Sequence, residues 1–107
     1  MNILIVVTAA NKKEAEKIAQ ALLKKKLVAC ANIISGVSSL FWWQGKIDRC
    51  REVVLFLKTK RSLFKDITKV VKSLHSYEVP EIIALPIIEG ERNYLRWLSE
   101  CTTYRTK

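Results

Sequence analysis

The sequence predicts an α+β fold of the ferredoxin-like class, a β-α-β-β-α-β sandwich followed by an additional C-terminal helix. Two observations predict this class. Apolar runs of strand length alternate with stretches in which apolar residues recur every three or four positions. In addition, Gln44-Gly45 separates two long β-like stretches, as in the turn of a long hairpin. The length of 107 residues, half of them apolar, predicts a single domain over residues 1–107.

The first strand and the first helix have the clearest local signals. Ile3–Val7 is entirely apolar, which is typical of a strand buried on both faces. Asn11 and Glu14 stand in capping-box positions at the start of the helix. The apolar residues that follow at helical spacing are Ala15, Ile18, Ala19 and Leu22.

The middle of the chain predicts the long hairpin. The segment from Leu27 to Trp43 is β-like but is interrupted by Ser and Gly, so we interpret it as one long or bulged strand. The second hairpin strand is predicted over Lys46–Lys60, with Val53–Leu57 as its buried centre.

The second half of the chain is again predicted to contain a helix followed by a strand. Ser62 is a candidate cap for a second helix, and 75–80 is a loop because Pro80 disfavours helix at the preceding residue. Glu81–Ile88 is predicted as a strand, in which Pro86 requires an edge position or a bulge. The apolar face of the second helix consists of Leu63, Ile67, Val70, Val71 and Leu74.

The last helix is expected to begin at Gly90. Its large side chains are Tyr94, Leu95, Trp97 and Leu98. The polar tail Cys101–Lys107 is expected either to add a short strand or to lack regular structure.

The strand patterns also predict self-association. One face of a ferredoxin-like sheet is normally wet, so its strands should alternate apolar and polar residues. Three strand centres do not alternate, and one domain has too few helices to cover both faces. A neighbouring copy of the chain is the expected cover, and the terminal helix with the tail is the alternative.

Composition indicates a cytoplasmic protein. No apolar run approaches the roughly 18 residues that a membrane span needs, so no membrane association is expected. The N-terminus lacks the basic region of a signal peptide. Three cysteines without tight spacing do not form the framework of a secreted domain.

The net charge of +9 raises the question of an anionic partner such as nucleic acid. The cations are spread along the chain, and Lys24-Lys25-Lys26 stands where it complements a helix dipole. Phe41-Trp42-Trp43 offers stacking surface, but the RNA-binding pattern of basic residue, Gly and aromatic is absent. We therefore expect a solvated lysine surface, aromatic packing and no nucleic-acid partner.

No catalytic arrangement is evident, and we expect no enzymatic activity. Gly-rich phosphate loops and CxxC pairs are absent, and His75 is the single histidine. Glu78 and Glu81 flank a proline loop, where carboxylates either contact a cation or are solvated.

Several runs together carry a family resemblance. They are Ala29-Cys30-Ala31-Asn32-Ile33, Phe41-Trp42-Trp43-Gln44-Gly45-Lys46-Ile47, Leu57-Lys58-Thr59, the run from His75 to Ala84, and Gly90 with Tyr94-Leu95-Arg96-Trp97. In order and spacing they resemble the CutA divalent-cation tolerance family. Tyr77-Glu78-Val79-Pro80-Glu81-Ile82 is the most specific piece.

The resemblance implies a cytoplasmic homotrimer with a ferredoxin-like fold that acts in copper and divalent-cation tolerance, without an enzymatic reaction. The alternative is a small-molecule-sensing trimer like the nitrogen-regulatory PII proteins. The resemblance also implies a ligand cleft near a subunit boundary. Its residues are Trp42, Lys58, Tyr77, Glu81 and Trp97.

For metal binding, the resemblance leaves one candidate ligand in this chain. The copper ligands proposed for some bacterial members correspond to Val7, Leu74 and His75, of which only His75 is a candidate ligand. Imidazole suits divalent copper. We therefore expect weak copper binding, micromolar or looser, with a contribution from His75.

Overall fold

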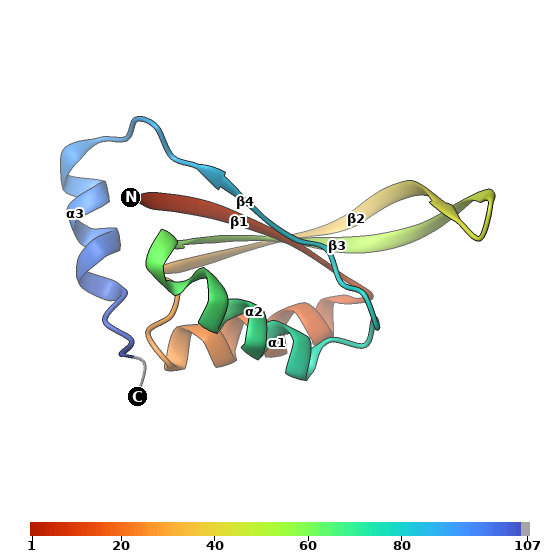
Figure 1. Cartoon of the computed structure of the whole chain (residues 1–107), viewed down its shortest axis with the longest axis horizontal. Helices are drawn as coiled ribbons and strands as arrows, with labels where there is room; N and C mark the ends of the chain where they lie inside the picture. Colours follow the sequence, from red (N-terminus) through yellow and green to blue (C-terminus); the bar gives the residue numbers. More distant parts are fainter. Residues whose placement is uncertain (106–107) are drawn as a thin grey trace.

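The computed structural model describes residues 1–105 and consists of a four-stranded antiparallel sheet with helices on one face (Figure 1). The strand order is β2-β3-β1-β4. This is the predicted α+β arrangement with the predicted order of elements. The elements are β1 Asn2–Ala9, α1 Lys12–Lys24, β2 Cys30–Trp43, β3 Lys46–Lys60, the 3-10 turn η1 Arg61–Leu63, α2 Phe64–Leu74, β4 Ile82–Pro86 and α3 Arg92–Cys101.

The predicted N-cap of α1 is confirmed, but the Glu14 side chain bonds to a different N–H group than predicted. The Asn11 side chain accepts a hydrogen bond from the Glu14 N–H at 2.8 Å, as a capping residue should. The Glu14 carboxylate accepts from the Ala10 N–H at 2.9 Å, one residue before the position that a capping box predicts. The helix therefore starts where the sequence places it, and Glu14 ties its first turn to the end of β1.

The long hairpin is confirmed as well. Gln44 and Gly45 have φ values of 49° and 78°, which is the left-handed pair of a type I′ turn. The predicted bulge lies between Ile34 and Val37 of β2. Beyond this bulge the two strands continue away from the rest of the sheet as an arm, drawn at the right of Figure 1. We refer to residues 37–52 as the arm.

Three element boundaries differ from the predictions. Ser62 does not cap α2, because it lies inside η1, and α2 begins without a side-chain cap. The last strand is shorter than Glu81–Ile88 and spans Ile82–Pro86, at the edge of the sheet as Pro86 requires. Helix α3 begins at Arg92 with Glu91 as its cap rather than at Gly90.

The tail was expected to add a strand or to lack regular structure. Residues 102–105 form no strand, and residues 106–107 lie outside the described part of the chain. Buried Thr102 fastens this segment, because its hydroxyl donates to the Leu98 carbonyl at 3.0 Å and its own carbonyl accepts from Lys60 Nζ at 2.9 Å.

The hydrophobic core lies between the sheet and the pair α1 and α2. Within one chain, the expectation that β1 is buried on both faces is wrong. Ile5 and Val7 point into the core and are fully buried, whereas Leu4 and Val6 point the other way and are half-buried. The residues of β1 are apolar on both faces of the strand, but the helices cover only one of these faces.

The opposite face of the sheet is apolar and uncovered. Ile83 and Leu85 are 51% and 46% exposed there, and Val6 pairs with both Ile83 and Phe56. Helix α3 lies at one end of the sheet and leaves this surface open (Figure 1), so the alternative in which α3 covers it is wrong. We call it the open sheet face. Its residues are Val6, Ile34, Val54, Phe56, Ile83 and Leu85.

Candidate functional site

Two residues of the predicted cleft, Lys58 and Trp97, are linked through Tyr94 at the α3 end of the sheet. Lys58 Nζ lies over the ring of Tyr94, 5.6 Å from its centroid. The Tyr94 ring in turn packs against Trp97, with centroids 5.5 Å apart. The sequence pattern assigned Tyr94 only to the last helix, but its position one helical turn before Trp97 is the signal that would have found it.

The other three cleft residues lie elsewhere in the chain. Trp42 is 73% exposed on the arm, and the tip of the arm and α3 are at opposite ends of the molecule (Figure 1). Tyr77 and Glu81 belong to the segment between α2 and β4. A single chain therefore does not bring the five residues together.

The segment after α2 is held by a set of hydrogen bonds around His75. The His75 Nε2 lies 2.6 Å from the Thr8 carbonyl oxygen, and Nδ1 accepts from the Tyr77 N–H at 3.0 Å. A carbonyl oxygen can only accept, so Nε2 carries a proton in its contact with Thr8. A metal ion would have to displace one of these two bonds to coordinate His75.

Glu14 is the second anchor of this segment. Its carboxylate accepts from the Ser76 N–H at 2.6 Å and from the Ala10 N–H. Partial burial raises the pKa of Glu14, but the hydrogen bonds from Ala10 and Ser76, together with nearby His75, outweigh it and the pKa lies below its ordinary value of 4.5. Ionised Glu14 thus joins β1, α1 and the segment after α2.

Tyr77 and Glu52 form the third anchor. The Tyr77 hydroxyl donates to a Glu52 carboxylate oxygen at 2.8 Å, and burial together with this bond raises the pKa of Tyr77. Burial and the Glu52 charge also raise the pKa of the Cys50 thiol. Glu52 pairs with Val37, immediately after the bulge where the arm begins. The only sequence signal for Glu52 is a lone carboxylate directly before the buried run Val53–Leu57.

The described residues do not form a preassembled metal centre. Within residues 1–105, no group of three or more His, Cys, Asp or Glu side chains is close enough to hold an ion. Glu14 lies near His75, but its carboxylate is already engaged in hydrogen bonds to Ala10 and Ser76.

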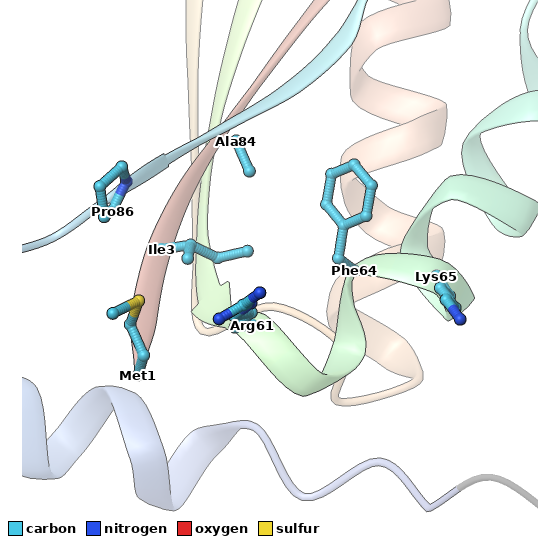
Figure 2. Close-up of a pocket in the computed structure, with 7 residues that line it drawn as sticks. All are labelled: Met1, Ile3, Arg61, Phe64, Lys65, Ala84 and Pro86. Carbon is cyan, nitrogen blue, oxygen red and sulfur yellow. The ribbon is translucent and has the colours of Figure 1, made fainter.

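One open cavity of about 560 Å³ lies between the start of α2 and edge strand β4 (Figure 2). The Phe64 side chain points toward Ala84, whereas Lys65 points away from it. None of the predicted cleft residues lines this cavity. Its lining residues are Met1, Ile3, Arg61, Phe64, Lys65, Ala84 and Pro86.

The Glu14 anchor leads to a pH prediction. The pKa of Glu14 is lower in the folded chain than its ordinary value of 4.5. Ionised Glu14 therefore stabilises the fold above pH 4.5, and this stabilisation is lost as the pH falls through the lowered pKa of the folded chain. We expect Glu14→Gln to lower the free energy of unfolding at pH 7 by about 1 kcal/mol. The difference should shrink on acidification toward pH 3 in urea unfolding. Exposed Glu16→Gln is the control, and equal behaviour of both variants would contradict the assignment.

Membrane-spanning structure was not expected, and within residues 1–105 no helix has the length and apolar character needed to cross a bilayer.

Known proteins are similar to this sequence over nearly its whole length. A family model described as "CutA1 divalent ion tolerance protein" matches residues 3–101. The divalent-cation tolerance protein CutA of Thermus thermophilus is 43% identical over 95% of this chain and 99% of its own length. The chloroplastic CutA 1 of Oryza sativa is 43% identical over 94% of this chain, which spans just over half (57%) of that longer protein.

Solved structures agree with the sequence comparison. The CutA1 structure from Thermus thermophilus superimposes with a TM-score of 0.94, covering 95% of this chain and 99% of that one at 43% identity. The periplasmic divalent cation tolerance protein CutA from Archaeoglobus fulgidus gives 0.93 at 42% identity, with the same coverage. The sequence, the sheet order and these matches together establish that the chain belongs to the CutA1 divalent ion tolerance protein family.

Proposed function

We propose that this chain acts in divalent-cation tolerance as a non-enzymatic, single-domain homotrimer, with copper as one of its metal ions. The observation that carries the proposal is the end-to-end match to a protein described as a divalent-cation tolerance protein. The relatives reported above share that description or the CutA name, which favours it over the small-molecule-sensing alternative.

The homotrimer is supported by two uncovered apolar surfaces. The open sheet face needs a cover that α1, α2 and α3 do not supply. On the arm, Leu40, Trp42 and Ile47 are also exposed. Large contiguous apolar patches of this kind mark association sites. A closed ring of copies would bury both without leaving an edge for further growth.

The ligand cleft is part of the same proposal. Lys58 and Trp97 lie at the α3 end of the molecule, and Trp42 lies on the arm at the opposite end. These cleft residues can therefore meet only if the arm of one copy approaches the α3 end of a neighbouring copy. A cation, a carboxylate and aromatic rings suit a small polar ligand.

Alanine at Lys58 or Glu81 tests whether this cleft binds a ligand or only joins subunits. We expect each variant to remain trimeric and to lose at least half of the thermal stabilisation that citrate, glutamate or ATP gives the parent chain. Scanning fluorimetry and light scattering measure the two effects. The matched controls are Lys17→Ala and Glu89→Ala, which are exposed and outside the cleft. Loss of the trimer with unchanged ligand response would assign these residues to the interface instead.

Copper titration tests the metal part of the proposal. We expect binding in the micromolar range or weaker, because coordination by His75 must break its bond to Thr8 or to Tyr77. His75→Ala should weaken it several-fold in calorimetry, and Ser73→Ala is a control close by in the chain. Equal affinity of the variant would remove His75 from the site. Nanomolar binding would show that further ligands exist.

A cytoplasmic location completes the proposal. Cys30, Cys50 and Cys101 are free thiols, which suits a reducing compartment. The relatives differ in this respect, since the rice protein is described as chloroplastic and the Archaeoglobus protein as periplasmic.

A further inference from the structure

The fold gathers positive charge that is dispersed in the sequence. Residues 11–26 hold six lysines and two glutamates, and residues 61–74 hold three lysines, one arginine and one aspartate. These two segments form the helix layer and its ends, and they carry seven of the nine net positive charges. All the remaining residues together carry the other two.

Six of these lysines point directly away from the core. On α1 the buried residues face the sheet, and Lys13, Lys17 and Lys24 lie on the opposite side of the helix. On α2 the exposed lysines stand opposite buried Ile67 and Val71 in the same way. We call this surface the lysine face. Its residues are Lys13, Lys17, Lys24, Lys65, Lys69 and Lys72.

The two helices carry the lysines in parallel rows. Helices α1 and α2 lie side by side beneath the sheet in Figure 1 and contact each other. Lysines four residues apart are separated by about 6 Å along a helix axis, and packed helices lie about 8–10 Å apart. Such rows can follow the closely spaced phosphates of a nucleic-acid duplex.

Two of the three carboxylates in these segments, Glu14 and Glu16, do little to neutralise these rows. Glu14 is turned toward the N–H groups of Ala10 and Ser76. Glu16 faces Lys12 in an exposed pair with a long N···O distance of 4.0 Å. The lysine face therefore presents a positive potential to an approaching polyanion.

We propose that the lysine face binds a nucleic-acid duplex through its phosphates, without sequence preference. A membrane surface fits less well, because amphipathic helices bind lipid through inserted Trp, Phe or Leu. Among the described residues of α1 and α2, Leu23 is the one large apolar side chain that is markedly exposed, at 39%. The exposed tryptophans Trp42, Trp43 and Trp97 lie on the arm and α3, so base stacking is not part of this surface.

The lysine face remains accessible whatever covers the open sheet face, because the two are on opposite sides of the sheet. In the proposed homotrimer three lysine faces would point outward. Several faces on one particle increase avidity for a long duplex, although each face alone is sufficient for the contact.

Fluorescence polarisation with a labelled duplex of about 24 base pairs and arbitrary sequence tests the proposal between about 50 and 200 mM salt. We expect micromolar binding at the lower salt concentration, with an affinity that falls steeply as salt rises. The variant Lys13→Gln/Lys17→Gln/Lys69→Gln/Lys72→Gln should bind at least tenfold more weakly. Its slope of log affinity against log salt should be shallower by about 3 to 4, since each phosphate that a lysine neutralises adds roughly 0.9.

The matched control removes the same net charge elsewhere through Lys46→Gln/Arg92→Gln/Arg96→Gln/Arg105→Gln, all exposed and outside the lysine face. It should bind within threefold of the parent chain, and light scattering should show the same particle mass for all three proteins. The proposal is wrong if the parent does not bind at the lower salt concentration, or if both variants weaken equally. Tighter binding to vesicles rich in phosphatidylserine than to the duplex would identify a membrane surface instead.

Discussion

Light scattering on the purified protein is expected to give about three times the 12.3 kDa mass of the chain, and Phe56→Glu is expected to reduce it to that of single chains. Phe56 stands in the middle of the open sheet face, beside Val6. Burying an aromatic ring of this size stabilises by about 1.5–3 kcal/mol for each copy. A carboxylate in its place would have to be buried without a partner, which costs more than the ring contributed.

Leu23→Glu is the matched control, because Leu23 is an exposed apolar residue on the helix side, away from the open sheet face. It should leave the particle mass unchanged. A parent chain that stays monomeric at micromolar concentration would overturn the homotrimer. A Phe56→Glu variant that remains trimeric would place the interface elsewhere than on the open sheet face.

Leu55→Ala is expected to destabilise the fold strongly. Leu55 is fully buried and lies between Val7 of β1 and Ile33 of β2 in the sheet register. Removing its branched end from a packed core leaves a cavity, and such changes cost about 2–5 kcal/mol. Urea unfolding followed by circular dichroism, at one fixed protein concentration, measures the decrease in the free energy of unfolding.

Leu23→Ala removes the same atoms from a partly exposed site and should cost less than about 1 kcal/mol. Similar decreases for the two variants would mean that the core between the sheet and the helices is not where most of the stability resides. Because assembly adds to apparent stability, both variants need to be compared at the same particle mass.

Local signals were enough for the order of the elements. The Gln44-Gly45 pair required a tight turn, and the structure has both residues at positive φ. Pro86 excluded a central strand, and β4 lies at the sheet edge. Asn11 marked the start of α1 because a capping side chain acts on an N–H only three residues away. Each of these features depends on a few neighbouring residues.

Predictions were less successful where the deciding partner is distant in the chain. Ser62 has the chemistry of a cap, but it lies inside η1, where the Arg61 N–H donates to the carbonyl of distant Met1. His75 looked like an available imidazole, whereas both of its ring nitrogens bond to backbone atoms, one of them on β1. The cleft residues Lys58 and Trp97 are linked by Tyr94, and Trp42 stays at the far end of the arm.

The sequence by itself determined the elements, their order and the hairpin, because periodicity and turn chemistry act over one or two turns of chain. Only the tertiary structure decided which apolar faces remain uncovered and where charge collects. Val6 and Phe56 are remote in sequence and adjacent on the open sheet face. The lysines of α1 and α2 are likewise remote in sequence and share one surface, because both helices bury their apolar sides against the same face of the sheet.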